Sequence, residues 1–107
     1  MFYRIFLEFN DGFQTYPSLE SISSQAVFIE DSDDKATVAL QKFMAGISRI
    51  PGIVLKEVTL FQYRIERPSE NGTIASGNDT VIFTWFSFID TVSFEEKISK
   101  RVSQIQE

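Results

Sequence analysis

The side chains that could do chemistry in this sequence are carboxylates, lysines and hydroxyls, because the chain contains neither histidine nor cysteine. Histidine is the commonest general base, and histidine and cysteine are the usual zinc ligands, so most enzyme classes are excluded. A carboxylate pair remains, for example Glu30 with Asp90 at two predicted strand ends, but no pattern in the sequence brings them together. We therefore expect a protein that is not an enzyme and uses no cofactor or metal.

The densest cluster of charge is the run Glu30-Asp31-Ser32-Asp33-Asp34. It could hold a hard cation, but the calcium-loop pattern fails because the glycine of the sharp turn and the closing glutamate are missing. Two interpretations stay open. One is a docking patch of Glu30, Asp31, Asp33 and Asp34 for a cationic partner surface. The other is a helix N-terminus whose acids complement the helix dipole.

The net charge of −5 is unevenly distributed, since residues 1–34 hold seven of the 15 acids and one of the 10 basic residues. Nucleic acids and anionic membranes require a basic footprint, so we expect neither as a partner. A protein partner, or further copies of the chain, is expected instead. The sequence shows no secretory signal pattern and no apolar run of membrane-spanning length, which predicts a cytoplasmic location. For a viral protein this means the host cytoplasm, or the virion for a structural subunit.

Hydrophobic periodicity predicts the elements of the first half of the chain. Residues 2–9 alternate between apolar and polar side chains, as a strand does, and residues 13–16 and 26–30 predict two shorter strands. Apolar residues then recur at three-to-four spacing over residues 36–50, which predicts an amphipathic helix that starts at the acidic cluster. Pro51-Gly52 stops this helix.

The second half continues with two strands and a helix. Residues 53–67 and 80–89 are rich in β-branched and aromatic residues, and Ser93 with Glu96 forms a capping box that opens a closing helix. The order β-β-α-β-β-α predicts one α+β domain over residues 1–107, with an antiparallel sheet of about four strands and two helices packed on one face. In element order alone it resembles a ferredoxin-like or split βαβ arrangement.

Residues 80–89 are apolar on both faces, which suggests a central strand covered twice. Two helices on one face leave the second face to be covered by residues 11–25 or by another chain. Trp and Phe are enriched in interface cores, so Trp85 and Phe86 become candidate partner contacts.

Residues 68–79 predict a hairpin connection longer than usual, with turn residues at Asn71-Gly72 and Gly77-Asn78. Because long loops often carry contacts, Asn71 and Asn78 join the candidate partner-binding residues.

Three functions remain compatible with these features. The first is a non-catalytic protein-binding module, such as a small acidic inhibitor or immunity-type protein that occludes a basic surface. The strand-to-helix run at residues 26–36 is similar to junctions in many small uncharacterised bacterial and phage proteins, a similarity that implies no activity. The second is a structural subunit of a homo-oligomeric or virion-like assembly. The third is a small-ligand carrier, which would need a pocket.

Overall fold

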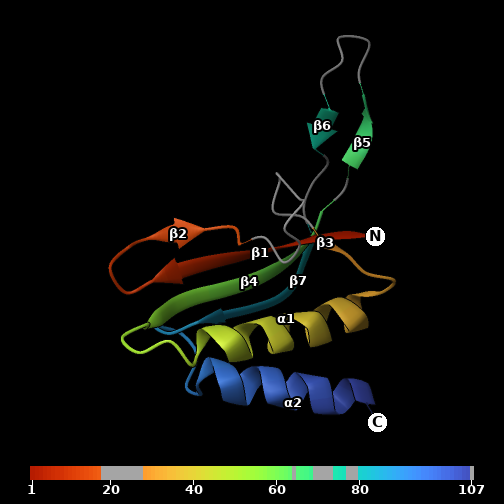
Figure 1. Ribbon diagram of the computed structural model, residues 1–107. Coiled ribbons are helices and arrows are strands. Elements are labelled where there is room, and N and C mark those ends of the chain that lie inside the picture. The colour runs from red at the N-terminus through yellow and green to blue at the C-terminus, as the bar shows by residue number, and fades with distance from the viewer. Residues whose placement is uncertain (18–27, 64, 69–73, 77–79, 107) are drawn as a thin grey trace.

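The computed structural model describes residues 1–17, 28–63, 65–68, 74–76 and 80–106. Figure 1 shows an antiparallel sheet with both helices on one side of it, which confirms the predicted α+β class. In chain order the elements are β1 (Phe2–Phe9), β2 (Gln14–Thr15), β3 (Phe28–Ile29), α1 (Asp33–Ile47), β4 (Leu55–Tyr63), β5 (Ile65–Pro68), β6 (Ile74–Ser76), β7 (Thr80–Phe86) and α2 (Phe94–Gln106).

The main sheet has the strand order β2-β1-β4-β7, and β3 also pairs with β1. β4 runs along the length of β1, from Tyr63 opposite Phe2 to Leu55 opposite Phe9. β2 and β3 therefore share the other edge of β1, with β2 near its C-terminal end and β3 at its N-terminal end. The predicted strand over residues 53–67 is divided into β4 and β5. β5 pairs with β6 in a separate hairpin, which extends away from the helices in Figure 1.

The core lies between the sheet and the two helices. Alternate residues of the strands point toward the helices because side chains in a strand have a period of two, and the helices contribute residues at three-to-four spacing. Phe94 of α2 packs edge-on against Phe83 and Trp85 of β7, with ring centroids 6.0 and 6.1 Å apart. The buried hydrophobic residues are Tyr3, Ile5, Leu7, Phe28, Ala36, Leu40, Met44, Val58, Leu60, Phe83, Trp85, Phe94, Ile98 and Val102.

Both helices begin where the sequence places a capping side chain. The Ser32 hydroxyl accepts a hydrogen bond from the Lys35 N–H at 3.2 Å, and the Ser93 hydroxyl accepts one from the Glu96 N–H at 3.2 Å. Each bond satisfies a backbone donor that the first helical turn leaves without an intrahelical partner. The predicted starts of both helices are thus confirmed. The first helix ends at Ile47, a few residues before the predicted stop.

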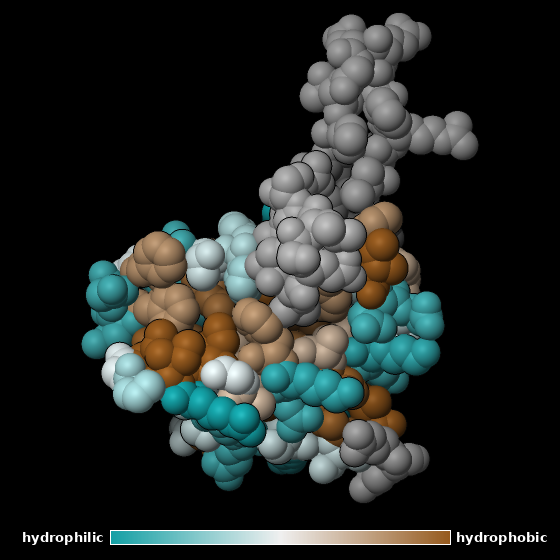
Figure 2. All heavy atoms as spheres, in the orientation of Figure 1, coloured by the Kyte–Doolittle hydropathy of each residue, from teal (hydrophilic) through white to brown (hydrophobic). Residues whose placement is uncertain are grey.

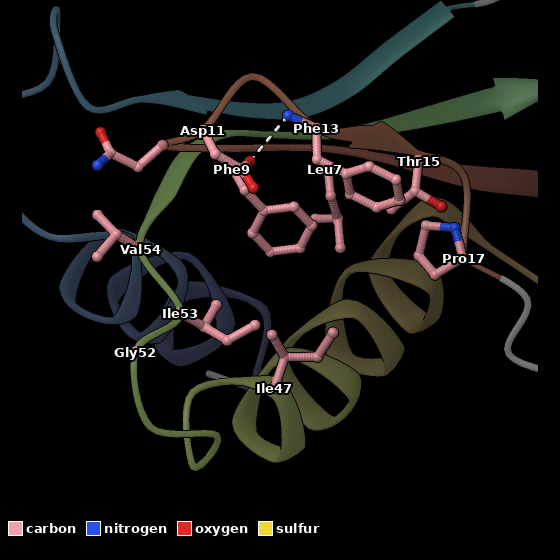
Figure 3. Close-up of a pocket in the computed structure, with 11 residues that line it drawn as sticks. Leu7, Phe9, Asp11, Phe13, Thr15, Pro17, Ile47, Gly52, Ile53 and Val54 are labelled. Atoms are coloured by element: carbon pink, nitrogen blue, oxygen red, sulfur yellow. Dashed lines mark hydrogen bonds between the residues drawn. The ribbon is translucent and has the colours of Figure 1, made fainter.

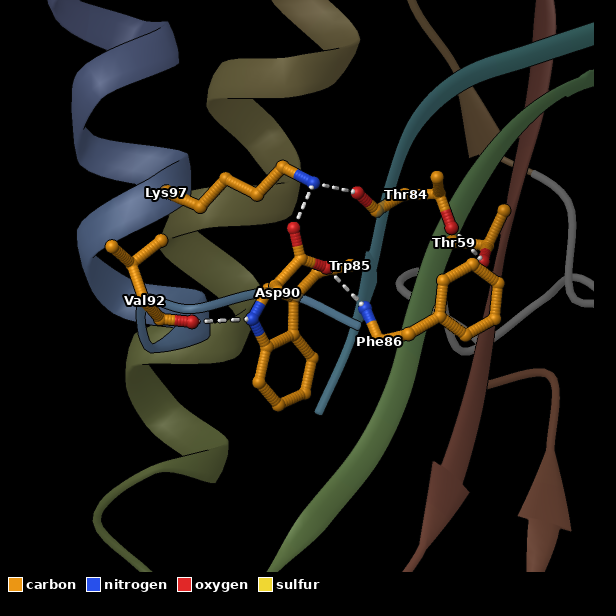
Figure 4. Close-up of polar contacts among 7 residues, drawn as sticks. All are labelled: Thr59, Thr84, Trp85, Phe86, Asp90, Val92 and Lys97. Carbon is orange, nitrogen blue, oxygen red and sulfur yellow. Dashed lines mark hydrogen bonds and ion pairs between the residues drawn. The ribbon is translucent and has the colours of Figure 1, made fainter. Parts of the chain in front are cut away.

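β7 is an edge strand, and our expectation of a central strand was wrong. The Ser87 N–H donates to the Lys56 carbonyl of β4 at 2.9 Å, so the backbone groups of Phe86 and Thr84 point away from β4 by the alternation of an antiparallel ladder. Two side chains occupy these outward groups (Figure 4). The Phe86 N–H donates to Asp90 Oδ2 at 2.7 Å, and Lys97 Nζ donates to the Thr84 carbonyl at 2.7 Å.

Asp90 and Lys97 also pair with each other, with a distance of 2.8 Å between Lys97 Nζ and Asp90 Oδ1. The hydrogen bond from Lys97, together with that from the Phe86 N–H, holds the pKa of Asp90 below its usual value. The two side chains occupy backbone groups with which a further strand would pair, so they hinder strand addition at one end of the β7 edge. Proteins commonly protect exposed edges with charged side chains.

The second face of the sheet carries half-buried aromatic side chains around Arg4. The Arg4 guanidinium carbon lies 4.8 Å from the ring centroid of Tyr16 and 5.8 Å from that of Phe61, and the Phe6 and Tyr16 centroids are 5.3 Å apart. Tyr16 therefore lies over β1 on this face, and whether residues 11–25 cover the second face of residues 80–89 stays a prediction. Residues 18–25 lie outside the described part of the chain.

Candidate functional site

The acidic cluster at the start of α1 is held largely by contacts within the protein. The Tyr3 hydroxyl donates to Asp33 Oδ1 at 2.7 Å, and Asp31 Oδ2 lies 3.0 Å from Lys35 Nζ, whose hydrogen bond lowers the pKa of Asp31. The backbone of Glu30 pairs with that of Met1 through two hydrogen bonds of 3.0 and 3.1 Å. These contacts support the helix-start interpretation, while the use of these acids for docking stays a prediction.

The bond between Tyr3 and Asp33 links β1 to α1. The Tyr3 side chain is buried in the core beside Phe28. Burial, followed by the hydrogen bond and the charge of Asp33, raises the pKa of Tyr3 to about 12. Asp33 is therefore a structural acceptor for a buried hydroxyl, which the sequence did not reveal because thirty positions separate the two residues.

Trp85 and Phe86, two of the other predicted contact residues, are not brought to the acidic cluster. Trp85 is only 7% exposed and its Nε1–H donates to the Val92 carbonyl at 2.9 Å, so it lies in the core rather than on a contact surface. Phe86 is half buried and its ring lies 5.5 Å from that of Phe88. Asn71 and Asn78 lie outside the described residues.

Three chain connections meet at one end of the sheet, opposite to the acidic cluster. Residues 10–13 follow β1, residues 48–54 join α1 to β4, and residues 87–93 join β7 to α2 (Figure 1). The Asn10 N–H donates to the Val54 carbonyl at 2.9 Å, which joins the first two connections. The third connection, residues 87–93, starts at the same end of the sheet, because Phe86 at the end of β7 pairs with Glu57 near the start of β4.

Exposed apolar side chains are concentrated in these three connections. Twelve large hydrophobic residues are exposed in the described ranges, and seven of them belong to these connections. We call these seven residues the apolar end: Phe13, Ile50, Ile53, Val54, Phe88, Ile89 and Val92. Figure 2 shows hydrophobic side chains gathered between β2 and the C-terminal end of α1. Apolar side chains that gather on a surface in this way commonly mark an interaction site.

The apolar end contains a groove of about 490 Å³ between β2, Ile47 of α1 and residues 52–54. Figure 3 shows Phe9 and Phe13 pointing into the space that Ile47 and Ile53 border from the other side. α1 packs against β4 and β7, whereas Thr15 of β2 lines the open groove. A smaller hollow of about 240 Å³ lies on the other side of Ile53 and Val54, next to Trp85 and Phe94.

The charged residues that line the groove and the hollow are acidic. Asp11 is the one charged residue among the described residues that line the groove, and Glu95 is the one that lines the hollow. Asp11 Oδ1 accepts a hydrogen bond from the Phe13 N–H at 2.9 Å, which fixes the turn that presents Phe13. Nearby, Lys56 lies 3.6 Å from Glu8, and Arg49 is exposed in the neighbouring connection.

The sequence contained a signal for this surface that we did not use. Ile53 and Val54 are β-branched and were assigned to the following strand, but the strand begins at Leu55. An apolar pair directly after the Pro51-Gly52 turn lies in a connection, where side chains are commonly exposed.

No protein-family model, curated protein or solved structure matches the chain. Within the described ranges no helix is both long and apolar enough to cross a membrane. Among the same residues, no group of three or more histidine, cysteine, aspartate or glutamate side chains is placed to hold a metal ion.

Proposed function

We propose that this protein is a non-catalytic protein-binding module that docks onto its partner through the apolar end. The observation that carries the proposal is the concentration of exposed apolar side chains at the end of the sheet where three connections meet, with three of these side chains bordering a groove. Phe13, Ile53 and Val54 border the groove and are 59%, 38% and 56% exposed. A partner that covers them gains roughly 25 cal/mol for each Å² of apolar surface removed from water.

The surrounding structure supports docking without a large rearrangement. The turn that carries Phe13 is fixed by Asp11 and by the bond from the Gly12 N–H to the Phe9 carbonyl at 2.9 Å. Val54 is tied to Asn10 through its carbonyl. A surface whose backbone is already ordered loses less conformational entropy on binding, which favours affinity.

The proposal predicts that peptides selected against the protein depend on the apolar end. We would select binders from a displayed library of random peptides and compare their affinities for the wild type and two variants. Val54→Ser removes an apolar contact, which lowers affinity by about 1 to 2 kcal/mol, or roughly five- to thirtyfold. Val81→Ser is the matched control, because Val81 is also an exposed valine, at 52% against 56%, but lies on β7 toward the opposite end of the sheet.

Peptides that bind the Val54→Ser and Val81→Ser variants equally well would contradict the proposal, as would the enrichment of no peptide. The mass of the purified protein in solution tests the assembly alternative. Light scattering of the wild type that gives a stable oligomer, and of Val54→Ser that gives a monomer, would mean that the apolar end joins copies of the chain.

A further inference from the structure

We infer that the groove accepts an apolar side chain from a partner segment that also carries lysine or arginine beside that side chain. This inference rests on the proposed function and adds the chemistry of the partner. Its basis is the combination of an apolar groove with acidic lining residues, Asp11 at the groove and Glu95 at the hollow.

The dimensions of the groove fit a side chain rather than a whole domain. Its volume of about 490 Å³ lies at the small end of the range of about 300 to 1,000 Å³ that is usual for ligand pockets. Leu7 and Phe9 of β1 and Ile47 of α1 form apolar walls. An aliphatic or aromatic side chain that enters between these walls has no polar group of its own to leave unsatisfied.

The charges of Asp11 and Glu95 determine which residues of the partner can lie next to the inserted side chain. An acidic apolar ligand, such as a fatty acid, would place its carboxylate near Asp11 and meets no basic residue among the described lining residues. A cation in the same position gains from Asp11, and a second cation across Ile53 and Val54 gains from Glu95. The net charge of −5 adds a long-range attraction for a cationic segment.

A second copy of the chain fits this surface less well. Two apolar ends that meet face to face would bring the acidic residues of one copy toward those of the other, which costs energy when charges are desolvated. Lys56 and Arg49 are the exposed cations closest in sequence to Ile53. Neither is among the lining residues of the two cavities, and Lys56 Nζ lies 3.6 Å from Glu8 Oε2. We therefore assign the groove to a cationic partner segment.

Two synthetic peptides with blocked ends test the inference. Both contain the same Phe-Leu pair, which lysines flank in one peptide and glutamates flank in the other. Methyl NMR of the protein should show shifts of Ile47, Ile53 and Val54 with the lysine peptide. Its affinity should exceed that of the glutamate peptide by about three- to tenfold for the two rim charges, and the difference should shrink as salt is added.

Variants identify the groups responsible for the difference. The double variant Asp11→Asn with Glu95→Gln should lose most of the difference in affinity between the two peptides, apart from the long-range attraction of the remaining net negative charge. It should keep the shifts of the groove methyl groups. Asp34→Asn is the matched control, because it removes an exposed acid at the opposite end and should keep the full difference.

The outcomes separate this inference from the function on which it rests. If library-selected peptides depend on Val54 but the lysine and glutamate peptides bind equally, docking through the apolar end stands and the cationic partner is overturned. If neither peptide shifts the groove methyl groups, the inference is overturned as well. Shifts of these methyl groups that depend on protein concentration without peptide would assign the groove to a second copy instead.

Discussion

The hydrogen bond between Tyr3 and Asp33 makes a measurable contribution to stability if the acidic cluster is structural. Tyr3→Phe removes the bond but leaves the exposed Asp33 carboxylate in water, which should cost about 1 kcal/mol. Asp33→Ala leaves a buried hydroxyl without its acceptor, which costs about 1 to 3 kcal/mol, and removes an acid from the first helical turn, which adds about 0.3 to 1 kcal/mol. The double variant should be about 1 kcal/mol more stable than the sum of the two losses predicts.

Urea unfolding measures these free energies, with the fluorescence of the single tryptophan, Trp85, as the signal from the core. Asp34→Ala is the control, since it removes an acid from the same turn and should lose only the contribution of the helix dipole. The reasoning is refuted if Asp33→Ala costs no more than Asp34→Ala, or if the losses of Tyr3→Phe and Asp33→Ala simply add. Asp33 would then be available for docking, as the sequence alone allowed.

Three further predictions follow from the same structure. The pKa of Tyr3 is raised to about 12, so the contribution of the protonated Tyr3 hydroxyl to the free energy of unfolding is complete below the ordinary pKa of tyrosine and is lost as the pH rises toward 12. Unfolding followed by circular dichroism at increasing pH should show this loss of stability in the wild type but not in Tyr3→Phe. Leu40→Ala should lower the free energy of unfolding by about 2 to 5 kcal/mol in urea titrations, because Leu40 of α1 is fully buried in the core; a loss below about 1 kcal/mol would mean that the site repacks. Lys97→Met uncovers the outward Thr84 carbonyl and leaves Asp90 without its cation. Sedimentation of this variant should then show more concentration-dependent association than the wild type, through the edge of β7. Association equal to that of the wild type would show that the edge is protected in another way.

The sequence predicted the elements whose signals are local. The alternation over β1, the capping residues Ser32 and Ser93 and the spacing of apolar residues in α1 and α2 depend on neighbours a few positions away, so they can be read from one chain. Strand order is different because it depends on pairing between distant segments. The residues of β7 are apolar on both faces whether β7 lies in the centre or at the edge, and only the structure shows Asp90 and Lys97 on its outer side.

The candidate site was missed for a related reason. The sequence drew attention to clustered acids and to tryptophan. In the structure, however, Asp33 accepts a hydrogen bond from the Tyr3 hydroxyl of β1, and Trp85 packs against Phe94 of α2. Each contact joins two separate elements, so neither can be seen in a local stretch of sequence. The apolar end is made of a few exposed residues from each of three connections that lie far apart in sequence. The pair Ile53-Val54 is a local signal for one connection, but the convergence of all three follows only from the antiparallel sheet that places them at one end.

Acidic residues have different roles at the two ends of the sheet. At the start of α1, Asp31 and Asp33 are engaged by Lys35 and Tyr3, so their charges stabilise the helix and its attachment to β1. At the apolar end, Asp11 fixes a turn through one oxygen while its carboxylate borders the groove. The same residue type therefore supports folding at one end and, in our proposal, selects a cationic partner at the other. In our proposal the acidic composition serves an inhibitor of a basic surface, while the contact that gives affinity is apolar, because exposed ion pairs contribute little beyond steering and selectivity.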